Sequence, residues 1–284
     1  MRVLGISPFH DSSVAIINDG KLEYYTKEER LSGVKRDMSP HTALNFIIKN
    51  IEGDIDIAVI SSPSDDDSYN KFLINLLGKT FNCEVIHMSH EHHLSHASLA
   101  FNNSGFQSAL VVVVDRMGSG CGGLMREAES IFKVDQEYKF KPIYKSYWLY
   151  RIGEEYDEQN FRRGLELKST YPNCEIVADS CLSIQKVFET ATNLIGQSTL
   201  EGGKTMGLAA YGKDKKFKNL FIEGIPNTNL FMHLFEYDQP PILKEYYHHK
   251  INKGTLLPKE GYELYADYAY QVQTQSQNEV LALI

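Results

Sequence analysis

The chain has 284 residues, of which 42% are hydrophobic and 23% charged, a composition that predicts a globular protein with a large core. Its net charge of −8 comes from 37 acidic and 29 basic residues, and no segment is dominated by Lys and Arg, so neither nucleic acid nor an anionic membrane is an expected partner. The longest apolar run, Ala109 to Val114, is far shorter than the about 20 residues of a membrane-spanning helix, and the 4 scattered cysteines favour a reducing cytoplasm as the compartment.

The first part of the chain shows three short strands followed by alternating helices and strands. Asn18-Asp19-Gly20 has hairpin chemistry, because Gly accepts a positive φ without steric cost, so the second and third strands are expected to be antiparallel. Ser39 as N-cap and Pro40 in the first turn predict the start of the first helix. The expected elements are strands at 3–6, 14–17 and 21–26, a helix at 39–53, a strand at 55–60, a helix at 69–77, a strand at 84–88 and a helix at 92–101.

A second set of strands begins at Ala109, so a series of three short strands occurs twice along the chain. Two lobes that each begin with three strands indicate an α/β fold of the actin-like type, in which two ribonuclease-H-like lobes enclose a ligand cleft. We expect the first lobe at 1–107 and the second at 108–284. The elements expected in the second lobe are strands at 111–114, 122–126 and 130–134, a helix at 182–194, a glycine-rich loop at 201–212 and a long helix at 262–284.

The end of the chain, Val280 to Ile284, is apolar and has no helix stop signal. The alternating strands that complete the first lobe also have no counterpart beyond Lys139. We therefore expect the second lobe to be cut short. The apolar side of the last helix, including Tyr268 and Val272, should then be exposed, available to a separate partner or to self-association.

The sharpest local signal is the segment HEHHLSHASLAF, in which His92 and His96 are four residues apart and share one face of the expected helix. Two such imidazoles can hold one divalent metal together with a third, oxygen ligand from elsewhere. The alternative is a polar, partly exposed helix start. The HExxH pattern of zinc proteases is excluded, because Leu94 stands where the second histidine is required.

Two strand ends carry further polar candidates. Asp115 follows an apolar strand and precedes a glycine turn, where a carboxylate faces a metal or phosphate and the amides of Gly118 and Gly120 could cradle an oxyanion; an ordinary hairpin is an equal alternative. In the first lobe, His10 and Ser12 lie on the loop between the first two strands, where the histidine and the hydroxyl are expected to face the cleft and Ser12 to contact the cofactor. There His10 could act as a general base, or it could simply be solvated.

Two charged segments could contact an anion. The segment EGGKTMGLAAYG is not a Walker A loop, because Ser198 stands where the pattern needs Gly, but a glycine-rich segment with one Lys suits an anionic ligand or a turn between helices. Arg30 lies in a stretch of mixed charge that is typical of a solvated surface. Its expected place beside the cleft would also let it bind phosphate.

Five motifs stand in order along the chain: LGISPFHDSSVAIINDG, KEERLSGVKRD, HEHHLSHASLAF, VVVVDRMGSG and EGGKTMGLAAYG. Together they resemble the carbamoyltransferase family of the nodulation-protein and antibiotic-biosynthesis type, whose N-terminal domain is similar to the universal tRNA threonylcarbamoyladenosine synthesis protein. The resemblance runs from Met1 to about Gly212, with a weaker echo at 266–283. It implies transfer of a carbamoyl group from carbamoyl adenylate, made from carbamoyl phosphate and ATP, to a hydroxyl of a sugar or secondary metabolite.

The resemblance also implies roles for particular residues. A divalent metal, iron first with zinc or magnesium as alternatives, would be held by His92, His96 and Asp115. The cleft histidine would be His10. The loop that contacts the anion would contribute Gly203, Lys204 and Gly207.

The chain departs from the family pattern in three respects. Asp115 is followed by Arg116 where the family commonly has Gly, and EGGK replaces the acidic glycine motif GEGK. Family members are also much longer, with a late metal-binding Asp and a second domain of YrdC-like fold that makes carbamoyl adenylate. This chain alone is therefore not expected to complete the reaction.

Two other function classes remain open. An actin-like sugar kinase or ATPase would use similar phosphate loops, but it needs no histidine pair. A non-catalytic, truncated relative would bind a nucleotide or a partner without turnover.

Overall fold

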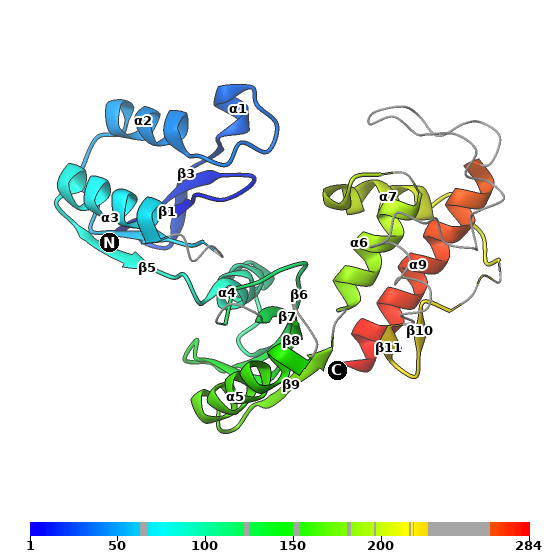
Figure 1. Ribbon diagram of the computed structural model, residues 1–284. Coiled ribbons are helices and arrows are strands. Elements are labelled where there is room, and N and C mark those ends of the chain that lie inside the picture. The colour runs from blue at the N-terminus through cyan, green and yellow to red at the C-terminus, as the bar shows by residue number, and fades with distance from the viewer. Residues whose placement is uncertain are drawn as a thin grey trace.

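The computed structural model describes residues 1–62, 67–121, 125–149, 154–180, 183–195, 197–215, 217, 219–226 and 262–284. It is a mixed α/β protein with three groups of elements: an N-terminal sheet with its helices, a central sheet with its helices, and a C-terminal helical group (Figure 1). No helix in these ranges combines the length and the apolar character that crossing a membrane requires.

The N-terminal sheet has five strands in the order β3-β2-β1-β4-β5. The first three are antiparallel neighbours, while β1, β4 and β5 run parallel. Asp19 and Gly20 in the β2–β3 turn have positive φ angles of 47° and 79°, so the expected hairpin is confirmed. The strands are β1 Arg2–Ser7, β2 Ser13–Asn18, β3 Lys21–Lys27, β4 Ile57–Ile60 and β5 Glu84–His87.

Two helices, α2 His41–Asn50 and α3 Asp67–Phe81, pack into one apolar core with this sheet, and the short helix α1 Glu29–Ser32 precedes them. Ser39 does not cap α2 as expected. The N-terminus of α2 is instead held by buried Glu28, whose carboxylate accepts hydrogen bonds from the Thr42 and Ala43 amides at 2.7 and 2.8 Å. A carboxylate there satisfies free amides and complements the helix dipole.

The central sheet has the order β6-β7-β8-β9, with antiparallel pairs except for the parallel pair β8–β9. Its strands are β6 Ala109–Val114, β7 Met125–Val134, β8 Phe140–Leu149 and β9 Glu175–Ser180. The two short strands expected at 122–126 and 130–134 form one strand, β7, and 122–124 lie outside the described residues. The third strand is β8, where no element was expected.

The second sheet repeats the three-strand opening of the first but not the position of its fourth strand. In the N-terminal sheet the parallel strand β4 lies beside β1, whereas β9 lies beside β8. Helix α4 His92–Ser104 packs on β6 and β7 through Ala97 and Phe101, and α5 Glu154–Thr170 lies beside β9. The N-terminal turn of α4 therefore lies close to the carboxyl end of β6.

The C-terminal group contains helices α6 Ile184–Leu194, α7 Gly202–Ala209 and α9 Tyr262–Ala282, the short η1 Thr199–Glu201, and the small hairpin of β10 Phe221–Ile222 and β11 Ile225–Pro226. The expected glycine-rich loop at 201–212 is thus wrong over most of its length. Packing of α7 against α9 outweighs the cost of about 1 kcal/mol for each interior Gly.

Helix α9 does not leave its apolar side exposed as expected. Tyr268 and Val272 are buried in one core with residues of α6, so the first part of the helix is covered within the chain itself. Leu281 and Ile284, in contrast, are exposed near the end of the chain.

Candidate metal centre

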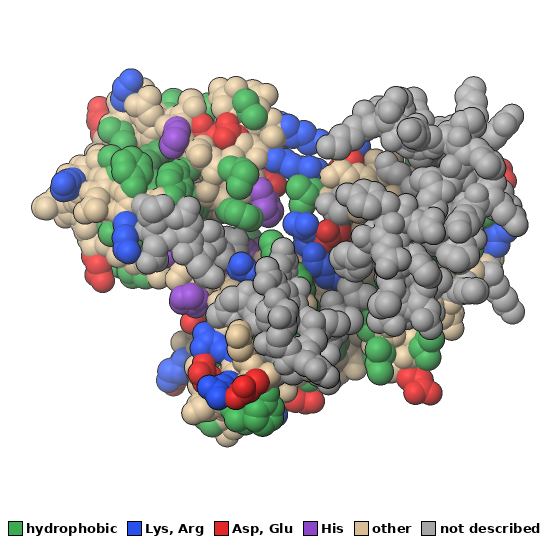
Figure 2. Space-filling model, viewed as in Figure 1, with side chains coloured by type: hydrophobic (Ala, Val, Ile, Leu, Met, Phe, Trp, Pro, Cys, Tyr) green, Lys and Arg blue, Asp and Glu red, His purple; other side chains and the backbone are tan. Residues whose placement is uncertain are grey.

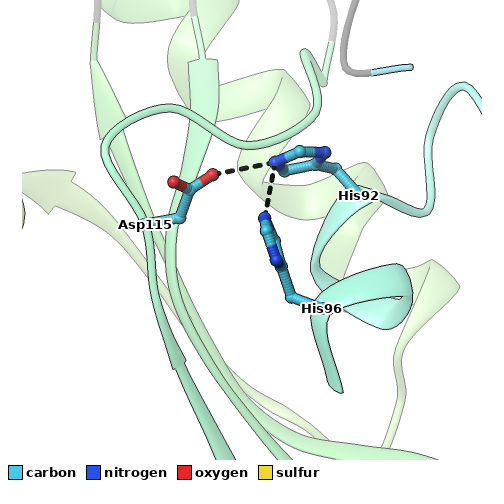
Figure 3. Close-up of side chains that lie close together, drawn as sticks. All are labelled: His92, His96 and Asp115. Carbon is cyan, nitrogen blue, oxygen red and sulfur yellow. Dashed lines mark hydrogen bonds and ion pairs between the residues drawn. The ribbon is translucent and has the colours of Figure 1, made fainter. Parts of the chain in front are cut away.

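His92, His96 and Asp115 come together from two elements that are adjacent only in the folded chain. His92 begins α4, His96 follows one turn later, and Asp115 comes directly after β6 (Figure 3). His92 Nε2 lies 3.0 Å from Asp115 Oδ2 and 3.0 Å from His96 Nε2. One ligand atom from each residue lies within 4.8 Å of the other two, so the expected cluster forms.

The backbone around Asp115 directs one of its carboxylate oxygens toward the histidines. The Asp115 amide donates to the Ala128 carbonyl at 3.0 Å, which continues the pairing between β6 and β7. The Arg116 amide donates to Asp115 Oδ1 at 2.7 Å. Because Oδ1 is held in this way, Oδ2 is the oxygen that faces the rings.

The electrostatics favour the forms of these side chains that ligate metals. Burial alone would raise the pKa of Asp115, but direct contact with His92 and the charges of the neighbouring histidines lower it to about 2. Burial, assisted by His92, lowers the pKa of His96. At neutral pH the cluster therefore presents an ionised carboxylate and a neutral imidazole, as metal binding requires.

The donor set fits a divalent transition metal. Two imidazole nitrogens and one carboxylate oxygen are ligands typical of zinc and of non-haem iron, whereas magnesium prefers oxygen donors. Three protein ligands would leave coordination positions open for water or substrate.

A buried polar network holds the start of α4 in place. The hydroxyl of buried Ser119 accepts from the His92 amide and donates to the Ser89 carbonyl, both at 3.1 Å. The Ser119 amide donates to Glu127 Oε2 at 3.1 Å, and the other Glu127 oxygen pairs with Lys145. Sequence reasoning missed these residues, since charges inside a strand are ordinarily exposed.

The glycine turn does not present a bare amide at Gly118. That amide donates to the Glu127 carbonyl at 3.0 Å, and Gly120 lies opposite Arg126 in a β-bridge. Gly118 instead gives room to His93: a Cβ at this position would lie 2.5 Å from His93 Nε2 and 2.8 Å from Glu127 Cβ.

Changing Gly118 to Ala is therefore expected to lower the free energy of unfolding by about 1–3 kcal/mol, as overpacking of a buried site does. Urea denaturation measures the change. Gly203, an exposed residue of α7 with open space where a Cβ would lie, is the matched control, and Gly203→Ala should leave stability unchanged or raise it by about 0.5–1 kcal/mol. Equal effects of the two substitutions would contradict the packing role of Gly118.

His10 and Ser12 lie on the loop between β1 and β2, and the structure gives them different environments. His10 is 49% exposed, and its Nδ1 lies 3.3 Å from Asp11 Oδ2. The pKa of Asp11 is lowered, because contact with His10 and the positive charge of Lys27 outweigh burial. The Ser12 hydroxyl, in contrast, is fully buried and donates to the Ser7 carbonyl at 2.8 Å, so it does not face a cleft as expected.

The remaining candidates lie on other groups of elements than the histidine cluster. Arg30, on α1, has an exposed side chain 3.8 Å from Glu29, and Lys204, on α7, is about half exposed and lies 2.6 Å from Glu201. Gly203 and Gly207 lie one turn apart on α7, with open space beside both.

The N-terminal and C-terminal groups face each other across a hollow. Figure 2 shows Lys and Arg side chains gathered along it. Arg36 reaches across and donates to the Leu200 carbonyl at 3.0 Å. Arg116, next to Asp115, makes a two-pronged ion pair with Glu189 of α6, at 2.7 and 3.1 Å. The residue beside the candidate metal ligand is thus tied to the helical group.

No family model and no curated protein matches this chain. Among solved structures, YeaZ from Pseudomonas aeruginosa is similar at 13% identity and a TM-score of 0.32, with 55% of this chain and 72% of that chain covered. Full-length HypF in its phosphate- and nucleotide-bound form has 14% identity and a TM-score of 0.46, with coverages of 99% and 46%. The Aquifex aeolicus Ppx/GppA phosphatase has 11% identity and a TM-score of 0.31, with coverages of 99% and 93%. Similarity at this level assigns no activity.

Proposed function

We propose that this chain is the acyl-transfer part of an O-carbamoyltransferase, which passes a carbamoyl group from carbamoyl adenylate to a hydroxyl acceptor. The observation that carries the proposal is the convergence of His92, His96 and Asp115 to within 4.8 Å. The five ordered sequence motifs support it, since they include these three residues and His10. The alternatives, an actin-like kinase or ATPase and a non-catalytic relative, do not need a histidine pair.

In this proposal His92, His96 and Asp115 hold a divalent cation, and the donor set favours iron or zinc over magnesium. When bound, such a cation supplies Lewis-acid polarisation of the acyl carbonyl. The protein contributes a fixed carboxylate, whose Oδ1 is held by the Arg116 amide, and a neutral His96 ring. At neutral pH the carboxylate is already ionised and the His96 ring is already neutral.

His10 is assigned the role of general base. Contact of its Nδ1 with Asp11 favours a proton on that nitrogen and leaves Nε2 free to accept one. The acceptor hydroxyl oxygen forms a bond to the carbamoyl carbon, His10 Nε2 takes the hydroxyl proton, and the bond from that carbon to the AMP oxygen breaks. AMP leaves as the anion, and the carbamate ester is the product.

In this proposal, Lys and Arg side chains along the hollow between the N-terminal and C-terminal groups would contact the anion of carbamoyl adenylate (Figure 2). Lys204 and Arg30 have exposed side chains for a phosphate. The side of α7 at Gly203 and Gly207 lacks side chains, which would let a ligand approach the helix closely.

The proposed function is tested by supplying the chain with carbamoyl phosphate, ATP, a divalent cation and a separately expressed domain that forms carbamoyl adenylate. AMP and carbamoylated product are then measured across a panel of hydroxyl acceptors. We expect carbamoylated product only when the chain is present. ADP release that does not depend on carbamoyl phosphate would instead support a kinase or ATPase, and binding without turnover would support a non-catalytic relative.

In the same assay, changing His10 to Ala is expected to slow carbamoyl transfer by about 100-fold or more, the usual loss when a general base is removed. Formation of carbamoyl adenylate by the added domain should continue at its normal rate. His41, an exposed histidine on α2, is the matched control, and His41→Ala should leave transfer unchanged. Equal losses in both half-reactions would count against His10 as the base.

A further inference from the structure

His93 lies between the two histidines of the candidate metal centre but points into the protein. Its side chain is fully buried, and its Nδ1 lies 2.7 Å from Ser130 Oγ. The other ring nitrogen, Nε2, is buried with no hydrogen-bond partner among the described residues. It faces Asp115 Oδ2 at 4.0 Å, the same oxygen that faces His92.

A buried nitrogen without a partner is unfavourable by about 1–3 kcal/mol, and an apolar side chain of similar shape would avoid that cost. The surroundings also leave space for this ring in particular, since Gly118 has no Cβ that would collide with Nε2. An unsatisfied buried group of this kind calls for an explanation. His93 is not within the group of atoms that could share one ion, so a role as a fourth ligand does not provide it.

The partners of the ring determine where its proton lies. A carboxylate oxygen can attract a proton on the nitrogen that faces it, and Asp115 Oδ2 faces Nε2 at 4.0 Å, so this contact favours a proton on Nε2. A neutral ring with a proton on Nε2 has an unprotonated Nδ1, which accepts from the Ser130 hydroxyl. Both contacts are therefore compatible with the tautomer that carries its proton on Nε2.

We propose that His93 is a positioning residue, whose Nε2–H faces Asp115 Oδ2 and keeps this carboxylate directed toward His92 and His96. This inference rests on the proposed function in one respect, namely that Asp115 serves as a metal ligand. The contacts of His93 themselves are present in the metal-free chain. Donors behind ligating carboxylates and imidazoles orient them, and loss of such a donor typically weakens metal binding by about 10–100-fold.

The tautomer is tested first, on the metal-free 284-residue chain labelled with ¹⁵N-histidine at pH 7.5. Two-bond correlation spectra distinguish a ring protonated on Nε2 from one protonated on Nδ1, and the His93→Gln variant identifies the signal. We expect the Nε2–H form, and we expect Ser130→Ala to populate the other form. A ring protonated on Nδ1 in the parent chain would overturn the proposal.

Metal affinity is tested next, by titrating Co²⁺ into the parent chain and two variants. Gln places an amide donor near the position of His Nε2, whereas Asn reaches only the position of Nδ1. We expect His93→Gln to bind within about 3-fold of the parent and His93→Asn about 10–100-fold more weakly. Equal affinity of the parent and both variants would overturn the proposal.

These outcomes separate the inference from the proposed function. A parent chain that binds no Co²⁺ refutes the proposed metal centre, while the tautomer measurement still decides the role of His93. If His93→Asn does not fold, as judged by circular dichroism, Ser130→Ala replaces it. That variant removes the hydroxyl that contacts Nδ1, and it too should bind Co²⁺ about 10-fold more weakly than the parent.

Discussion

Changing His96 to Ala is expected to weaken divalent-metal binding by at least about 100-fold, because it removes one of the three ligands found among the described residues. Loss of a residue that merely supports a ligand already costs about 10–100-fold. The parent chain should bind one transition-metal ion with His92, His96 and Asp115, whose ligand atoms already lie within 4.8 Å of one another. Isothermal titration with Co²⁺ or Zn²⁺ at pH 7.5 measures both values.

The matched control is His41→Ala, which removes an exposed histidine from the start of another helix and should bind metal like the parent. The pH of the titration suits the proposal, because burial lowers the pKa of His96 and Asp115 is ionised down to about pH 2. Protons therefore do not compete for these two ligands near neutrality. If His96→Ala kept the affinity of the parent, His96 would not be a ligand.

Changing Lys145 to Met is expected to lower the free energy of unfolding by about 3–5 kcal/mol, because it leaves Glu127 as a buried charge without its partner. Lys145 also lies over the rings of Phe132 and Tyr171, at 5.6 and 5.3 Å from their centroids, so its charge is surrounded by protein on several sides. Urea denaturation with the m-value held in common measures the loss.

Two controls define the cause of that loss. Lys141→Met changes an exposed lysine on the same strand and should alter stability by less than about 0.5 kcal/mol. Adding Glu127→Gln to Lys145→Met removes the unpaired charge but keeps an acceptor for the Ser119 amide, so it should recover much of the stability. No recovery in the double variant would show that packing by Lys145, and not the charge pair, is responsible.

The N-terminal sheet could be predicted from the sequence because its signals are local. Alternation and a two-residue turn with Gly20 set the hairpin, and the spacing of apolar residues set α2 and α3. The long helix α9 was predicted for the same reason. Contacts between distant residues could not be predicted. Glu28 binds the amides at the N-terminus of α2, which begins many residues later, and only the folded chain brings Glu28 to that helix.

The central sheet shows most clearly which features could not be predicted from the sequence alone. β7 contains Glu127 and Glu129, which interrupt its apolar pattern and so predicted two short strands in place of one. Both carboxylates are buried and bound, by Lys145 and by Ser146, which lie on the neighbouring strand β8. A charge can be buried only with its partner, and periodicity in one strand does not reveal a partner on another.

For the candidate site, the sequence alone determined the donor types and the pairing of His92 with His96, because residues four apart share a face of any helix. Asp115 could be predicted as the end residue of a strand, but only the packing of α4 on β6 brought it within 3.0 Å of His92. The different burial of the rings of His92 and its neighbour His93 was also decided by tertiary structure. Adjacent helix positions point about 100° apart, so packing against Gly118 and Ser130 buries the His93 ring, while the His92 ring stays partly exposed beside Asp115 and His96.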